Sequence, residues 1–456
     1  MKRVYQTDWL ASRPVFYNER TCQVSHNIND VIDYGNLEFD PDGFNDFLDF
    51  GYSVLEQTPV KHVKFLRHSS KLTVTDDGQL IIERFPDPVD TWLDRRLSED
   101  DVFELIRARI HNWEMQQEGE IIIPTSGGYD SRLLSTMIHD RSRIRAFTYG
   151  ISEDQIASSE VVFARELSRK LHTKWEQIFL GHYHKYFDYW DRLYGVSTHA
   201  HGMYHVEFYR QIRQKVSGNA LLLSGIIGDA WSGNVVAKVI KNPDDLTTLG
   251  YRHGLHSDSV MSHLPSQGEA RENYFNKQSD RLCDPRLYII ESMRFKIILL
   301  SYLLTIPLAF GFRPWSPFLD IEVATAMLNL PPERRQNRLW QKEFFARHGL
   351  DFEAQQLTCS YQNNLDYQAM RNIPPSPLPV RLLSSLVRSD YIEWINHHVS
   401  HQGDFWDTLY RLLQVPKVGG VLRCLRVRDE RLQAYYAYLT LKPIASLLER
   451  AQRIYG

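Results

Sequence analysis

The chain has few cysteines and almost no excess of charge of either sign. Four cysteines stand among 456 residues, and they form neither a metal-ligand spacing nor a disulfide framework. Such a scattered set is typical of a reducing compartment, and we expect a cytoplasmic location. The formal net charge is −3 at pH 7. We therefore expect no electrostatic field that would draw nucleic acid or an anionic membrane surface.

The sequence also lacks a long uninterrupted apolar run. Its most apolar stretch, residues 295–312, is interrupted by Lys296, Ser301, Tyr302, Thr305 and Pro307. This stretch is at the short end of the length that crosses a bilayer. We expect a buried helix there and no membrane span. The first residues of the chain contain no apolar signal core. An apolar content of 43% and a charged content of 24% are those of a globular protein.

A strand, a glycine loop and a helix are predicted in direct succession at residues 121–138. Three isoleucines at 121–123 indicate a buried strand, and Ser126, Gly127 and Gly128 form a tight loop after it. Adjacent glycines let backbone N–H groups close on an anion without a Cβ in the way. The helix that starts near Asp130 adds partial positive charge at the same place. The loop suits a pyrophosphate, although it is not a Walker motif, because no Gly-Lys-Ser/Thr follows.

The six residues Ser126-Gly127-Gly128-Tyr129-Asp130-Ser131 resemble the PP-loop of the ATP pyrophosphatase superfamily, written Ser-Gly-Gly-x-Asp-Ser. An ordinary βα turn with two glycines is the alternative interpretation. The resemblance implies cleavage of ATP between its α and β phosphates. Members of the superfamily transfer AMP to a carboxylate or carbonyl oxygen, and a nitrogen or sulfur nucleophile then displaces the AMP.

Further segments resemble the asparagine synthetase family, in the order in which that family has them. The first is a strand end, Phe147-Thr148-Tyr149-Gly150, followed by an acidic segment and a helix from Ser159 onward. The second is a glycine-rich turn that matches the family at Ser224, Gly225, Asp229 and Gly233. The last two, at residues 316–320 and 330–333, resemble the family's Pro-Phe-Leu-Asp and Leu-Pro-Pro-Glu segments. We interpret the chain as an asparagine synthetase-like synthetase domain.

This resemblance implies a role for each matched residue. Asp130 and Asp229 are the predicted catalytic residues, and both are expected to bind Mg²⁺. The β and γ phosphates of ATP are expected to lie against Ser126, Gly127, Gly128 and Ser131. Adenosine is expected against the backbone near Thr125, Tyr149, Ser224 and Gly225. The predicted cofactors are therefore ATP and Mg²⁺.

Several positions depart from the family pattern. Ile226 stands where the family carries Glu or Tyr, Ala230 replaces the usual Glu, and Trp231 follows it. The family's phosphate-binding lysine has no clear counterpart, because the segment 357–364 contains none, and Lys342 is the nearest candidate. The residues expected to bind ATP thus match the family pattern, whereas those expected to bind the acceptor carboxylate depart from it. This difference points away from aspartate as the substrate.

The N-terminal region resembles only the last part of the family's glutaminase domain. Glutamine-hydrolysing members begin Met-Cys, whereas this chain begins Met-Lys-Arg-Val, and its first cysteine is Cys22. Residues 47–52 and 58–66 resemble the segments that precede the family's linker. We predict a degenerate glutaminase-like domain at residues 1–95, a synthetase domain at 96–375 and a helical C-terminal extension at 376–456.

The predicted fold is α/β, with a doubly wound, mostly parallel sheet of the PP-loop (adenine nucleotide α-hydrolase-like) type. Its strands are expected at residues 120–123, 144–148, 175–180 and 220–223, with the site at their carboxyl ends. A large helical C-terminal part and a small α+β N-terminal remnant complete it. The sequence Ser98-Glu99-Asp100-Asp101 predicts the capped start of a helix that reaches residue 113.

Three functions remain open. The first is an ATP-dependent amide ligase that acts on a uronic acid, a peptide or a small metabolite, with ammonia, a separate ammonia donor or a substrate amine as nitrogen source. Glu114 and the histidines at 199, 201 and 205 are candidates for its acceptor pocket; a helix surface and a metal site are alternatives for the histidines. The second is sulfur transfer to RNA, which needs a cysteine pair and a basic surface that are not evident. The third is a non-catalytic ATP-binding descendant, which Ile226 and the missing lysine favour.

Overall fold

A five-stranded parallel sheet carries the segments singled out above. The computed structural model describes residues 2–218, 220–250, 257–400, 409, 412–413, 416–425, 427 and 429–455. The strand order is β11-β10-β7-β8-β9, and each neighbouring pair is parallel. The strands are β7 (Ile121–Pro124), β8 (Ile144–Tyr149), β9 (Lys174–Ile178), β10 (Leu221–Leu223) and β11 (Arg313–Trp315). The four expected strands are present, and β11 at the edge was not predicted.

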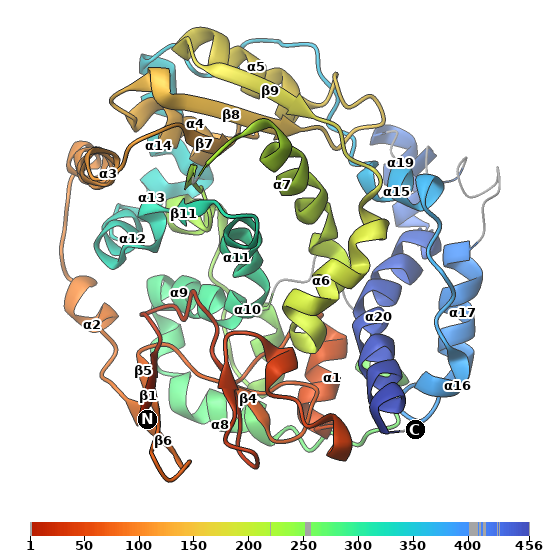
Figure 1. Ribbon diagram of the computed structural model, residues 1–456. Coiled ribbons are helices and arrows are strands. Elements are labelled where there is room, and N and C mark those ends of the chain that lie inside the picture. Colours follow the sequence, from red (N-terminus) through yellow and green to blue (C-terminus); the bar gives the residue numbers. More distant parts are fainter. Residues whose placement is uncertain are drawn as a thin grey trace.

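Helices cover both faces of this sheet, as a doubly wound α/β fold requires. Figure 1 shows α5 on one side of the strands and α7 on the other. Helix α5 contacts β8, β9 and α4, whereas α7 contacts β9 and α11. The bounds of these helices are Tyr129–Met137 (α4), Ser159–Leu171 (α5), Phe187–Tyr194 (α6), Met203–Lys215 (α7) and Tyr302–Ala309 (α11). The α/β class and the parallel sheet predicted from the sequence are confirmed.

Helix α3 (Glu99–Met115) begins where its cap predicts. The Ser98 hydroxyl accepts the N–H of Asp101 at 3.2 Å, and the Asp101 carboxylate accepts the N–H of Ser98 at 3.1 Å. This reciprocal pair satisfies two of the free donors at a helix start. Val102, Phe103, Ile106 and Ile110 are buried, and this helical spacing places one face of α3 on the core.

The N-terminal region is α+β, as expected. Two three-stranded antiparallel sheets have the orders β1-β5-β6 and β3-β2-β4. Their bounds, with those of the first helix, are Arg3–Gln6 (β1), Phe16–Asn18 (β2), Val24–Ser25 (β3), Pro41–Phe50 (α1), Val63–Phe65 (β4), Ser70–Val74 (β5) and Leu80–Arg84 (β6). The apolar core continues from this region into the rest of the chain: Phe50 meets Phe295 edge-on at 5.2 Å between ring centroids. Descent from a glutaminase domain, and the three domain boundaries, stay predictions.

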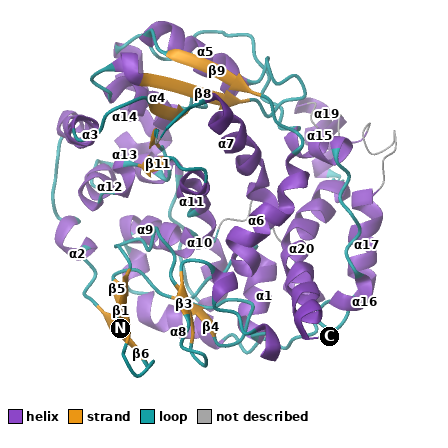
Figure 2. Cartoon of the chain, in the orientation of Figure 1, coloured by secondary structure: helices purple, strands orange, loops and turns teal. Residues whose placement is uncertain are grey.

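Most of the remaining described chain is helical (Figure 2). The helices are α2 (Val89–Trp92), α8 (Glu269–Gln278), α9 (Pro285–Phe295), α10 (Ile297–Leu300), α12 (Ile321–Leu328), α13 (Pro332–Arg335), α14 (Leu339–Arg347), α15 (Leu365–Asn372), α16 (Val380–Leu383), α17 (Ser389–Ser400), α19 (Pro416–Cys424) and α20 (Glu430–Tyr455). Helix α20 lies along α17 in Figure 1. Parts of the predicted extension at 376–456 lie outside the described residues.

The apolar stretch 295–312 does not form the single helix that the sequence suggested. It is divided between the end of α9, the short α10 and α11, with breaks at Lys296 and Ser301. Both interruptions are polar residues, and both are buried. Among the described residues, none of the helices combines the length and the apolarity that crossing a membrane demands.

Candidate nucleotide site

The candidate site lies where the direction of strand addition reverses. Strands β7 and β10 pair side by side, with Leu221 opposite Ile121 and Leu222 opposite Ile122. From β7 the chain proceeds to β8 on one side, and from β10 to β11 on the other. The connections therefore leave in opposite directions, the arrangement at which α/β sheets generally form a ligand crevice at the carboxyl ends of the strands. The loops that follow, 125–128 and 224–229, contain most of the predicted site residues, so the fold brings them together.

Gly127 has a conformation and surroundings that only glycine fits. Its φ is +67°, and an added Cβ would lie 2.3 Å from the Cβ of Phe163 and 2.7 Å from the backbone nitrogen of Ala164. The backbone of the loop is thus in close contact with α5. Gly128 is the N-cap of α4, and no side chain caps that helix. The Ser126 hydroxyl accepts the Gly128 N–H at 3.3 Å, and the N-cap residue leaves the first-turn donors of α4 without a side-chain cap, as an anion site needs.

A buried arginine side chain forms hydrogen bonds to this loop. The Arg132 guanidinium donates to the Gly127 carbonyl from Nε at 3.1 Å and from Nη2 at 2.6 Å. It also donates to the Leu350 carbonyl at 2.9 Å and to both carboxylate oxygens of Glu353 at 2.9 Å. Sequence reasoning missed Arg132, because an arginine in the first turns of a helix ordinarily faces solvent.

Asp130 projects from α4 against the glycine-rich turn after β10. A Cβ on Gly228 would lie 3.0 Å from the Asp130 Cγ, and one on Gly225 would lie 3.2 Å from the Asp130 Cβ. Burial, with the charge of Asp229 adding to it, raises the pKa of Asp130 to about 7. Its Oδ1 is buried and accepts no hydrogen bond from the described residues. A hard cation such as Mg²⁺ fits an oxygen ligand of this kind, and two carboxylates supply the charge that it prefers.

Asp229 is the more accessible of the two carboxylates, with 43% of its side chain exposed. It accepts a hydrogen bond from the Asn234 side chain at 3.0 Å, and the Arg338 guanidinium lies 3.9 Å away. Arg338 also faces the Tyr129 ring at 5.5 Å. Lys342, the lysine proposed from the sequence, lines the same cavity of about 430 Å³ as Tyr129 and Arg338. Arg338 was not predicted.

The segment that carries Arg338 is attached to the loop that carries Asp229. The Trp340 indole donates to the Ser232 carbonyl at 3.0 Å, and the Trp231 indole donates to the Phe318 carbonyl at 2.9 Å. A Cβ on Gly233 would come within 2.0 Å of the Arg335 carbonyl oxygen. Trp231, which departs from the family pattern, is thus a buried anchor of this loop.

The residues expected to face adenosine lie at the ends of β7, β8 and β10. The Thr125 N–H donates to the Phe147 carbonyl at 2.8 Å, and the Ser224 N–H donates to the Trp315 carbonyl at 2.8 Å. The Tyr149 ring packs against α7, 5.8 Å from the Tyr204 ring. Burial raises the pKa of the Tyr149 hydroxyl, which stays protonated at neutral pH. Whether these groups contact a nucleotide stays a prediction.

The part of the site that the sequence predicts to be changed contains apolar and basic groups. Ile226, in the turn after β10, is buried in the hydrophobic core, with 3% of its surface exposed. Ile227 has a φ of +55°, a strained conformation for a β-branched residue. Lys296 is buried nearby; burial lowers its pKa to about 8, and the charge of Asp229 opposes that decrease. A position for Lys296 near Asp229 was not predicted from the sequence.

Two candidates for the acceptor pocket have other roles. The Glu114 carboxylate accepts the N–H groups of His139 and Asp140 at 3.0 and 2.9 Å. These residues precede β8, so Glu114 lies at the amino edge of the sheet and its assignment to the pocket was wrong. His201 lies 3.2 Å from Asp366, which also accepts the Tyr183 hydroxyl at 2.6 Å. This pairing makes His201 part of a buried polar cluster.

Comparison with known proteins adds little. No protein-family model matches the chain, and no curated protein matches it in sequence. Among solved structures, an NH3-dependent NAD synthetase from Campylobacter jejuni aligns over 42% of this chain and 80% of its own, with 13% identity and a TM-score of 0.22. A similarity of this size supports no assignment of activity. The interpretation of the crevice rests on its own residues.

Proposed function

We propose that the protein is an ATP-dependent amide-forming ligase of the asparagine synthase type, built on a PP-loop fold. The observation that carries the proposal is the position of Asp130 and Asp229. Asp130, in the first turn of α4, and Asp229, in the turn after β10, lie close together at the strand-order reversal, beside the glycine loop. An ordinary βα turn would not require two neighbouring carboxylates next to a helix start that its N-cap side chain leaves uncapped.

In the proposed reaction a carboxylate oxygen of the acceptor attacks the α-phosphorus of ATP, and the bond to the β phosphate breaks. Pyrophosphate leaves, and the acceptor becomes an acyl-adenylate. Ammonia or an amine then attacks the acyl carbon, AMP leaves, and the nitrogen loses a proton. The backbone donors of the 125–128 loop, together with Ser131, would orient the β and γ phosphates.

Charge determines which residues support each step. Asp130 and Asp229 would hold Mg²⁺, which, when bound, neutralises negative charge on the phosphates. Arg338 and Lys342 would receive the pyrophosphate, taking the place of the lysine that the sequence does not supply. Arg338 already lies 3.9 Å from Asp229, so its charge is held at the expected metal site.

The acceptor is proposed to be a uronic acid sugar, a peptide or a small metabolite carboxylate, not aspartate. The support is Ile226, whose buried apolar side chain can neither accept a proton nor form a side-chain hydrogen bond. The nitrogen source is proposed to be free ammonia, ammonia from a separate donor, or an amine on the substrate. A non-catalytic descendant that binds ATP is the second candidate, and the same buried Ile226 favours it.

Nucleotide product analysis tests the proposal. The protein is incubated with Mg·ATP, ammonium and a panel of aspartate, glutamate, uronic acids and short peptides. We expect AMP and pyrophosphate that depend on one carboxylate and disappear in Asp130→Ala and Asp229→Ala. Full turnover in either variant would remove the role assigned to that aspartate. ATP binding without AMP from any carboxylate would favour the non-catalytic candidate.

A further inference from the structure

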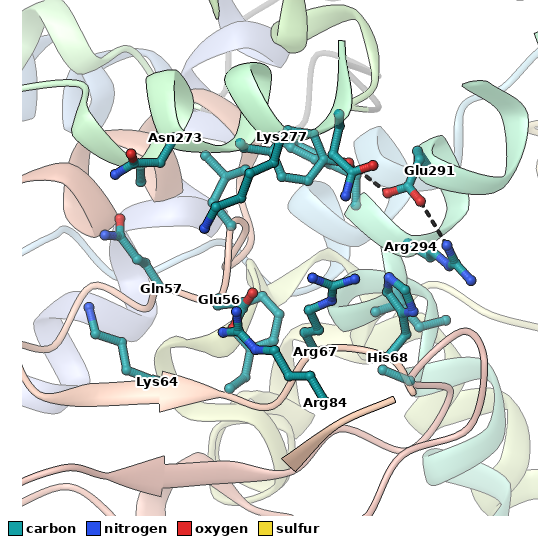
Figure 3. A pocket seen from close by; sticks show the side chains of 18 of the residues that line it. Glu56, Gln57, Lys64, Arg67, His68, Arg84, Asn273, Lys277, Glu291 and Arg294 are labelled. Carbon is teal, nitrogen blue, oxygen red and sulfur yellow. Dashed lines mark hydrogen bonds and ion pairs between the residues drawn. The ribbon is translucent and has the colours of Figure 1, made fainter. Parts of the chain in front are cut away.

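A second cavity, of about 350 Å³, lies between the N-terminal region and helices α8 and α9. It shares no lining residue with the crevice described above, so it is a separate site. Its apolar lining includes Leu10, Leu55 and Phe65 on the N-terminal side and Phe295 on the other. Figure 3 shows basic side chains extending into this space from both walls. A volume of this size suits a small metabolite.

The positive charges of the cavity are only partly neutralised. Arg84 pairs with Glu56 at 2.8 Å, and Lys64 lies 3.4 Å from Asp40. Neither the Arg67 guanidinium nor the Lys277 ammonium forms an ion pair or a hydrogen bond within the described part of the chain. Arg67 follows β4 on one wall and Lys277 belongs to α8 on the other, so the two face the same space (Figure 3).

Arg294, at one end of the cavity, is fully neutralised. It donates to Asp87 at 2.7 and 2.8 Å and to Glu291 at 2.7 Å. Asp87, Glu291 and His68 come close enough together to resemble a metal site. The arginine already supplies the positive charge there, and burial lowers the pKa of His68 to about 3, so this imidazole is neutral. In this cluster the carboxylates of Asp87 and Glu291 are thus neutralised by Arg294.

Hydrogen-bond acceptors without partners line the same space. The side-chain oxygens of Gln57 and Gln278 are buried, and within the described residues neither accepts a hydrogen bond. Buried polar atoms are nearly always paired, so a ligand that brings hydroxyl or ammonium donors would satisfy them. The carboxylate of the exposed residue Glu19, which also lines the cavity, is a further acceptor.

We propose that this cavity binds a small anionic metabolite that carries a phosphate or carboxylate group together with hydroxyl or ammonium donors. Arg67 and Lys277 hold the anionic group between the two walls, and the Gln57 and Gln278 amides accept the donors. Charge-assisted hydrogen bonds to an otherwise unpaired guanidinium are strong, which makes Arg67 the main contact. Because both walls contact the ligand, binding also ties the N-terminal region to α8.

Isothermal titration calorimetry on the full chain tests this site without ATP, so the result does not depend on the proposed ligase activity. The probes are glycerol 3-phosphate, which carries a phosphate, and malate, which carries carboxylates; neutral glycerol is the control ligand. The variants are Arg67→Gln and the exposed Lys277→Gln. Lys238→Gln, which removes an exposed lysine that lines no part of the cavity, is the matched control.

One anionic probe is expected to bind, with glycerol showing no heat. Each cavity variant should weaken that binding about tenfold or more, and Lys238→Gln should leave it unchanged. The probe that binds identifies the ligand as a phosphate or a carboxylate. Absence of binding by both probes overturns the proposal, as does binding that Lys277→Gln, with an unchanged circular dichroism spectrum, does not weaken. Binding that Arg338→Met abolishes would belong to the nucleotide crevice and would also overturn it.

Discussion

The guanidinium of Arg132 donates two hydrogen bonds to the carbonyl oxygen of Gly127, at 3.1 and 2.6 Å. Arg132 lies in α4, the helix that follows this loop, and it donates its other hydrogen bonds to Leu350 and Glu353. The conformation of the glycine loop is thus tied to a segment more than two hundred residues further along the chain.

Arg132→Met should weaken both the fold and the loop. It leaves the Gly127 carbonyl without these donors and removes the partner of Glu353, and we expect a loss of about 3 kcal/mol in the free energy of unfolding. Urea denaturation measures this loss. Arg169→Met, at an exposed pair with Glu166, should change stability by about 0.5 kcal/mol or less. Equal effects in the two variants would contradict the role of Arg132.

Gly127→Ala should be far more disruptive than Gly268→Ala. Both glycines have a left-handed backbone, with φ of +67° and +71°, so each alanine bears a similar conformational strain of about 1–2 kcal/mol. Around Gly268 the space is open, whereas at Gly127 the new Cβ would overlap Phe163. We expect the first variant to lose ATP binding and additional stability, as thermal unfolding with and without Mg·ATP would measure. Similar melting temperatures for both variants would show that the loop can move away from α5.

Arg338→Met should reduce kcat/KM for ATP by about tenfold or more, since a charged hydrogen bond to a phosphate contributes about 1.5–3 kcal/mol. The assay is AMP formation with the acceptor identified by the product analysis. Arg347→Met, at the other end of α14 and exposed, is the control and should keep the wild-type value. A variant of Arg338 with unchanged kcat/KM would separate this arginine from the phosphates.

His205→Phe should alter how stability depends on pH. Burial lowers the pKa of His205 to about 3, whereas the unfolded chain protonates it near 6.5. The folded state therefore loses stability as pH falls through 6.5. At pH 5 the loss from this residue is about 2 kcal/mol.

Phenylalanine cannot be protonated and fits among the surrounding tyrosine rings. Relative to wild type, His205→Phe should thus be about 2 kcal/mol more stable at pH 5 than at pH 7.5, which means a larger free energy of unfolding. Urea titrations at the two pH values test this difference. His263→Phe, at an exposed position, should follow the wild-type pH dependence.

Much of the sheet was predictable because its signals are local. Three buried isoleucines, two glycines and the start of a helix occupy adjacent positions, and each residue type indicates the conformation of its own neighbours. β11 was missed for the same reason. It has three residues, Arg313, Pro314 and Trp315, with no alternation to detect, and proline argues against a strand. Its place at the sheet edge makes the proline tolerable, because β10 is its single strand neighbour in the described sheet.

By itself, the sequence determined the α/β class, the parallel strands, the glycine loop and the two aspartates expected at the site. The tertiary structure decided which groups meet them. Arg132 at Leu350 and Arg338 at Asp229 are pairings between residues far apart in the chain, and Arg67 and Lys277 line one cavity from distant segments. Such pairings arise when helices and loops pack against one another, and the spacing of residues in the sequence carries no measure of that packing.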